Sequence, residues 1–160
     1  MPTRTPPARL LPTPPQHDLL TQTLERINRA SNAARVRVGA GRGTAPGRAE
    51  LRAIAREELE RLHLPSALAG PVADRLVATG GRARFGTYQS VTLPPSLVRW
   101  PGPDRVSLPT VAGRRTIRVY VDVRRGDLRP PLEGRPVNLV FRNNEFSLHA
   151  ADEPDPHDDR

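Results

Sequence analysis

The sequence predicts an α+β fold, in which N-terminal helices, one helix followed by a helical hairpin, pack on a small antiparallel sheet formed by the C-terminal half. Two observations support this class. As far as residue 81, apolar residues recur every three or four positions, which is the period of a helix buried on one face. From residue 82 onward, valine, threonine, tyrosine and phenylalanine stand between turn signals, as in strands.

Composition divides the chain into an ordered middle and two ends of different character. Among 160 residues there are 19 prolines, and only 36% of the residues are hydrophobic, which is low for a chain that is packed throughout. Because proline removes a backbone donor and restrains the residue before it, residues 1–17 are predicted to be a disordered proline-rich arm. Residues 18–150 are predicted to form a single α+β domain, and residues 151–160 a disordered acidic tail.

The first predicted helix begins after the arm. Asp18 can cap it, its apolar face fades near Ser31, and that face consists of Leu19, Leu20, Leu24 and Ile27. A short alternating segment, residues 35–38, is a strand candidate. Residues 39–47 are rich in glycine and are interpreted as a flexible linker, because a phosphate-binding Walker loop would need a lysine and the chain has none.

Two further helices form the predicted hairpin. One spans about residues 48–63 and is ended by the Leu64-Pro65 dipeptide. The other carries Pro71 in its first turn and stops at Gly80-Gly81. A DNA-binding helix-turn-helix is an alternative for such a pair, but the second helix has too few charged residues for a helix that reads a groove, which favours packing.

The second half predicts an antiparallel sheet of three to five strands. Residues 88–93 form one candidate strand and residues 116–123 the clearest one, with alternate valines and isoleucine on one face. Residues 136–142 and 145–150 flank Asn143-Asn144, a pair that tolerates the positive φ angles of a hairpin turn.

Arginine accounts for all 25 basic side chains, and its distribution is uneven. Residues 82–142 hold 12 arginines and 4 acids, whereas residues 143–160 hold one arginine and six acids. GC-rich codon usage is an alternative explanation for the missing lysine, but it does not explain a basic middle followed by an acidic end. Arginine grips phosphate with a planar fork of donors, so the pattern predicts a polyanionic partner.

The predicted nucleic-acid-binding residues are arginines of the second half and one aromatic ring. Some of these arginines interleave with aromatic residues, others flank the clearest strand, and the ring lies on the polar face of that strand. Basic side chains interleaved with rings contact phosphates and stack on bases. The predicted residues are Arg82, Arg84, Arg99, Arg114, Arg115, Arg118, Tyr120, Arg124, Arg125 and Arg129. The alternative interpretation of the charged strand is an edge protected from aggregation.

Several functional classes lack support in the sequence. Without cysteine there is no disulfide framework and no thiol chemistry, and the four histidines have no metal-binding spacing. No nucleophile elbow or paired catalytic carboxylates occur, so we expect no enzyme activity, no cofactor and no metal. Neither a signal peptide nor a membrane span is recognisable, so we expect no membrane partner and a cytoplasmic or virion-associated protein.

The resulting hypothesis is a small basic protein that binds DNA or RNA through phosphate contacts, largely without sequence specificity, using an arginine-rich β surface. The acidic tail would compete with nucleic acid for that surface. The alternative is a structural or adaptor protein of a phage or other multi-subunit assembly, whose flexible arms order on neighbouring subunits.

Overall fold

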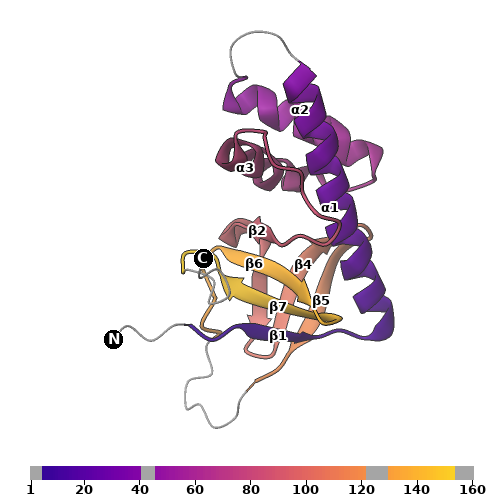
Figure 1. Cartoon of the computed structure of the whole chain (residues 1–160). Helices are drawn as coiled ribbons and strands as arrows, with labels where there is room; N and C mark the ends of the chain where they lie inside the picture. The colour runs from indigo at the N-terminus through magenta and orange to yellow at the C-terminus, as the bar shows by residue number, and fades with distance from the viewer. Residues whose placement is uncertain (1–4, 41–45, 122–129, 154–160) are drawn as a thin grey trace. The chain divides into compact units, whose positions relative to one another are not determined.

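A computed structural model describes residues 5–40, 46–121 and 130–153, and it confirms the predicted α+β class (Figure 1). The chain divides into two compact units. The helical unit comprises residues 17–89 and 110–113, and the sheet unit comprises residues 1–16, 90–109 and 114–160. The sequence predicts a single domain over residues 18–150, and contacts within the chain group its residues into these two units.

Most of the helical unit consists of α1 (Pro14–Ala40), α2 (Arg48–Arg61), the short 3₁₀ helix η1 (Ser66–Leu68) and α3 (Ala69–Thr79). The core is made by the apolar faces of these helices, among them Leu24, Ile27, Leu59 and Val72, each no more than 2% exposed. Gly80 ends α3 in the left-handed conformation (φ 62°), as the predicted glycine stop requires. The helix and helical hairpin of the prediction are thus present.

The first helix is longer than predicted at both ends. The prediction of a strand over residues 35–38 is wrong, because these residues are in α1. Ala34, which is fully buried, continues the apolar face one turn past Ile27 and Ala30. Arg37 then anchors the last turns through ion pairs with Glu57 (2.8 Å) and Glu58 (3.1 Å) of α2.

The start of α1 corrects the predicted Asp18 cap. The Thr13 hydroxyl accepts the Gln16 N–H at 3.3 Å, and the Gln16 side-chain oxygen accepts the Thr13 N–H at 3.0 Å. This reciprocal pair is a capping box, placed immediately before the helix. Pro14 and Pro15 occupy the first turn, where no backbone donor is required.

The sheet unit is a curled antiparallel sheet of seven strands, more than the three to five predicted (Figure 1). The strand order is β2-β6-β7-β1-β5-β4-β3. The strands are β1 (Ala8–Leu11), β2 (Val91–Leu93), β3 (Arg99–Gly102), β4 (Arg105–Thr110), β5 (Gly113–Val119), β6 (Val137–Arg142) and β7 (Glu145–Ala150).

One central strand, β1, comes from the N-terminal end of the chain. It lies between β7 and β5, with Ala8 opposite Leu148 and Leu10 opposite Val119. The predicted disordered arm is therefore wrong for residues 8–17, because residues 8–11 contain no proline and Leu10 is buried in the sheet core, while α1 begins at Pro14. Residues 1–4 lie outside the described residues.

The hairpin of β6 and β7 confirms the predicted Asn143-Asn144 turn. Both asparagines have positive φ angles, 53° and 62°, as a tight hairpin turn demands. Across the turn, the rings of Phe141 and Phe146 lie 4.5 Å apart between centroids. The pairing continues to Val137 opposite Ala150, so the turn sets the register of the whole hairpin.

Candidate nucleic-acid interface

The residues predicted to bind nucleic acid are found in both units. Arg82 and Arg84 are in the helical unit, in the loop that follows α3. The sheet unit contains five others: Arg99, Arg114, Arg115, Arg118 and Tyr120. The remaining three, Arg124, Arg125 and Arg129, lie outside the described residues.

In the helical unit, residues 82–89 form an ordered loop, with Arg82 and Arg84 exposed. Phe85 is 3% exposed and anchors the loop. Its backbone N–H donates to Asn32 Oδ1, and its carbonyl oxygen accepts from Asn32 Nδ2, both at 2.8 Å. Asn28 Nδ2 donates to two further carbonyls of the loop, at residues 87 and 89, each at 3.0 Å.

Beside this loop, Arg75 of α3 is a half-buried cation. Its guanidinium donates to Asn28 Oδ1 at 2.7 Å and to Ser31 Oγ at 3.0 Å, and it lies 4.1 Å from the centre of the Phe85 ring. Burial lowers the pKa of Arg75 to about 10. Arg75 therefore fixes the loop that carries Arg82 and Arg84, and it is not placed to contact a ligand.

The sheet has two distinct faces, because successive residues of a strand point to opposite sides. On the inner face, Ile117 and Val119 of β5 are buried, and Leu10 of β1 lies opposite Val119. On the other face, Arg118 lies opposite Leu11, and the Tyr120 N–H donates to the Arg9 carbonyl oxygen at 2.9 Å. The outer side of the sheet therefore carries four side chains where β1 pairs with β5 and the residue after it: Arg9, Leu11, Arg118 and Tyr120.

Three more arginines extend this outer side. The Val119 N–H donates to the Asp104 carbonyl oxygen at 2.7 Å, which puts residue 105 of β4 opposite Arg118. Farther along the sheet, strand pairing completes the set, with Arg99 opposite Ser107 and Arg142 opposite Glu145. We call this set of side chains the outer arginine face: Arg9, Leu11, Arg99, Arg105, Arg118, Tyr120 and Arg142.

Two predicted residues of the sheet unit do not contribute to this face in the expected way. Arg114 is half-buried and donates to the carbonyl oxygens of Leu97 and Ser107, each at 3.0 Å. Burial and the nearby charge of Arg99 lower the pKa of Arg114. Arg115 is exposed, but it has the parity of Ile117 and so lies on the opposite side of β5 from Arg118.

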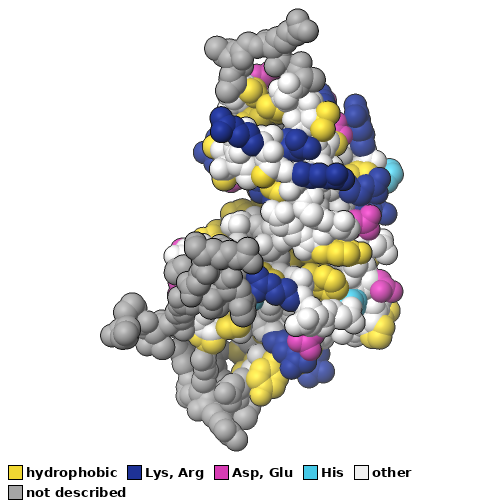
Figure 2. All heavy atoms as spheres, viewed as in Figure 1, with side chains coloured by type: hydrophobic (Ala, Val, Ile, Leu, Met, Phe, Trp, Pro, Cys, Tyr) yellow, Lys and Arg dark blue, Asp and Glu magenta, His cyan; other side chains and the backbone are white. Residues whose placement is uncertain are grey.

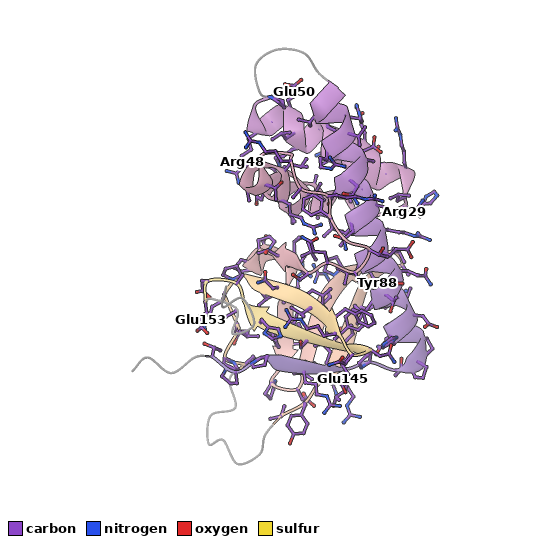
Figure 3. The ribbon with its side chains drawn as sticks, viewed as in Figure 1. Arg29, Arg48, Glu50, Tyr88, Glu145 and Glu153 are labelled. Atoms are coloured by element: carbon purple, nitrogen blue, oxygen red, sulfur yellow. The ribbon has the colours of Figure 1, made fainter. Side chains whose placement is uncertain are left out.

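Negative charge is scarce in the strands. They contain seven arginines, at positions 9, 99, 105, 114, 115, 118 and 142, and a single acid, Glu145. Arg9 Nη2 lies 3.0 Å from Oε1 of Glu145, the first residue of β7, which Figure 3 labels. Both side chains are more than half exposed, so this pair contributes only about 0–1 kcal/mol and does not neutralise the face.

Two exposed apolar side chains stand among these arginines. Tyr120 is 59% exposed and Leu11 is 37% exposed. Sequence reasoning selected Tyr120 and Arg118 but missed Arg9, Leu11, Arg105 and Arg142. For Arg9, the alternation of Ala8, Arg9 and Leu10 was a signal, masked by the neighbouring prolines.

The described part of the acidic end is bound within the sheet unit. Arg135 Nη2 lies 2.7 Å from Asp152 and 3.0 Å from Glu153, and the Thr5 hydroxyl donates to Glu153 at 2.6 Å. These partners lower the pKa of Glu153, the Thr5 hydrogen bond first and the Arg135 hydrogen bond second. Glu153 is labelled in Figure 3. Residues 154–160 of the predicted acidic tail lie outside the described residues.

Over the described ranges, no group of three or more histidine, aspartate or glutamate side chains is placed to hold a metal ion. None of the helices, as far as they are described, is long and apolar enough to cross a bilayer. Comparisons with protein-family models, curated proteins and solved structures find no significant match.

Proposed function

We propose that this protein binds nucleic acid through the outer arginine face, without strong sequence readout. The observation that supports the proposal is the strand register, which has Arg9, Arg105 and Arg118 on the same side of the sheet as the exposed Tyr120. Guanidinium groups pair with phosphates, and a flat exposed ring can stack on an unpaired base. The function is binding, and no chemical step is assigned to the face.

The expected energetics follow from the number of cations. Five arginines belong to the outer arginine face, at positions 9, 99, 105, 118 and 142. If each neutralises one phosphate of duplex DNA, the logarithm of the binding constant falls with the logarithm of salt concentration with a slope of about −4.5. Stacking of one base on Tyr120 adds roughly 1–3 kcal/mol for a single strand.

Fluorescence anisotropy with labelled oligonucleotides tests the proposal. Single-stranded and duplex DNA and the corresponding RNAs are titrated with the full chain at low salt. We expect binding below about 10 μM, since nonspecific dissociation constants commonly reach 10⁻⁴ to 10⁻⁶ M even at physiological salt. No binding to any of the four at that concentration would refute the proposal.

We also propose that the acidic end competes with nucleic acid for the outer arginine face. The segment to delete in a test is residues 154–160 and not residues 151–160, for the following reason. Deleting residues 151–160 would also remove the contacts of Asp152 and Glu153 with Arg135. Truncation after Glu153 keeps these contacts and removes Asp155, Asp158 and Asp159. We expect the truncated protein to bind duplex DNA several-fold more tightly at low salt, and an unchanged dissociation constant would dismiss the competition.

The exposed apolar pair also favours the second candidate function, a structural or adaptor protein of a larger assembly. Leu11 of β1 and Tyr120, the residue after β5, lie on the same side of the sheet, and such an exposed pair can be covered by another subunit. Light scattering after size-exclusion chromatography separates the two functions. Defined oligomers without nucleic acid, abolished by Leu11→Ser, would support assembly, and a monomer at all concentrations would exclude self-assembly.

A further inference from the structure

A hollow in the helical unit is lined by two arginines and by small side chains, which are alanines and one serine. Its volume is about 370 Å³, within the range of about 300–1,000 Å³ typical of small-molecule sites. Four residues of one face of α2 line it, spaced by three and four positions, and the rest comes from η1 and the start of α3. The lining residues are Ala49, Arg52, Ala53, Arg56, Ser66, Ala67 and Ala69.

The two arginines, Arg52 and Arg56, are one helical turn apart, so their guanidinium groups project on the same side of α2. Among the described residues, neither forms an ion pair with an acid. Other arginines of the helical unit do form ion pairs with acids. Arg37 and Arg61 pair with Glu58, and Arg48, labelled in Figure 3, pairs with Asp74. The hollow therefore keeps two positive charges that no carboxylate lining it offsets.

Neighbouring small residues keep the hollow open. A Cβ atom placed on Gly70 would lie 3.8 Å from Arg52 Nη2, so this guanidinium lies alongside the first turn of α3. The alanines present only methyl groups, and Ser66 adds a hydroxyl group that can donate a hydrogen bond. In Figure 2, several dark blue side chains are visible over the helical unit.

From this arrangement we infer that the hollow is a phosphate-binding site, in which Arg52 and Arg56 hold the phosphate oxygens and Ser66 donates a further hydrogen bond. Two guanidinium groups supply parallel donors that match a phosphate, and charge-assisted hydrogen bonds of this kind are stronger than neutral ones. The phosphate can belong to a free nucleotide or to a nucleic-acid end. This site uses no residue of the sheet unit and does not depend on the outer arginine face.

Nuclear magnetic resonance on the full chain tests the site, with the backbone amides of Ser66 and Ala67 as reporters. Three probes are titrated: inorganic phosphate, a nucleoside monophosphate, and a short oligothymidylate with or without a 5′-phosphate. We expect a dissociation constant for inorganic phosphate on the order of 1 mM, and weakening of at least about tenfold in the double variant R52Q/R56Q. Arg29 is an exposed arginine of α1, so Arg29→Gln is the control for removing a positive charge elsewhere on the unit, and it should bind like the wild type.

A second pair of variants distinguishes phosphate binding inside the hollow from attraction of phosphate by the overall positive charge of the unit. Ala53→Glu places a carboxylate in the hollow and should abolish phosphate binding, whereas Ala53→Gln adds nearly the same volume without charge and should retain more of it. Binding of the small probes identifies a free phosphate compound as the ligand, and binding of the 5′-phosphorylated oligonucleotide alone identifies a nucleic-acid end. If every probe binds R52Q/R56Q and A53E as tightly as the wild type, or none shifts the reporters at all, the inference fails. The triple variant R9Q/R105Q/R118Q should leave these shifts unchanged, so failure here and failure of the proposed function are distinguishable.

Discussion

Replacing Arg75 with methionine should destabilise the helical unit, although the methionine side chain fills most of the volume that the arginine side chain occupies. The side chain donates two charge-assisted hydrogen bonds, to Asn28 and Ser31, and bonds of this kind contribute about 1.5–3 kcal/mol each. The contact with the Phe85 ring adds roughly 1 kcal/mol. Together these interactions amount to about 4–7 kcal/mol.

Desolvation of the same guanidinium opposes these contributions. Burial lowers the pKa of Arg75 from its ordinary value to about 10, which corresponds to a penalty of roughly 3 kcal/mol for keeping the group charged. Methionine removes both the interactions and the penalty. The free energy of unfolding should therefore fall by about 1–4 kcal/mol, and we take about 2 kcal/mol as the expected value.

Urea denaturation followed by far-ultraviolet circular dichroism measures this change, because α-helices dominate that signal. Arg29→Met is the matched control. Arg29 is on α1 with a side chain 61% exposed and a long ion pair with Glu25 at 3.9 Å, so its replacement should change the free energy of unfolding by less than about 0.5 kcal/mol. If Arg75→Met proved as stable as Arg29→Met, the buried network would not hold the 82–89 loop as described.

Three further predictions concern the sheet unit. Tyr120→Ala should weaken binding of a single-stranded oligonucleotide by roughly 1–3 kcal/mol in an anisotropy titration, whereas Tyr120→Phe should not, since a stacking ring remains; equal losses in both variants would argue against stacking. Arg114→Met should lower the free energy of unfolding by about 1–3 kcal/mol and leave the salt slope of duplex binding unchanged, because its donors serve carbonyls inside the unit; a shallower slope would assign Arg114 to the phosphate contacts. The folded-state pKa of Glu153 lies below its ordinary value of 4.5, so its hydrogen bond with Thr5 stabilises the fold above pH 4.5, and this stabilisation is lost as the pH falls through the lowered pKa. In a carboxyl titration followed by nuclear magnetic resonance, Thr5→Val should raise the pKa of Glu153. An unchanged pKa would contradict the assignment.

Local signals in the sequence predict the elements that local chemistry determines. The Asn143-Asn144 turn was recognisable because few residues other than glycine accept two consecutive positive φ angles. The apolar period identified the helices, and Gly80 marked the end of α3. The capping box of Thr13 and Gln16 is also a local pattern, but the intervening prolines obscured it.

Long-range pairing explains what local signals could not predict. β1 has only four residues, and its partners lie near residues 118 and 148, more than a hundred positions away in the sequence. The outer arginine face depends on the same registers, because Arg9 and Arg105 reach the vicinity of Arg118 only through strand pairing. For the same reason, alternation alone could not distinguish Arg114, whose donors are used internally, from Arg118, which is exposed.

The salt dependence of duplex DNA binding tests the outer arginine face most directly. Anisotropy titrations of the wild type across a series of salt concentrations should give a log-log slope of about −4 to −5, and those of R9Q/R105Q/R118Q a slope shallower by about 2.7, since each phosphate that is no longer neutralised accounts for about 0.9. Arg29→Gln should keep the wild-type slope. A wild-type slope near zero, or a triple variant with the wild-type slope, would contradict phosphate binding by this face.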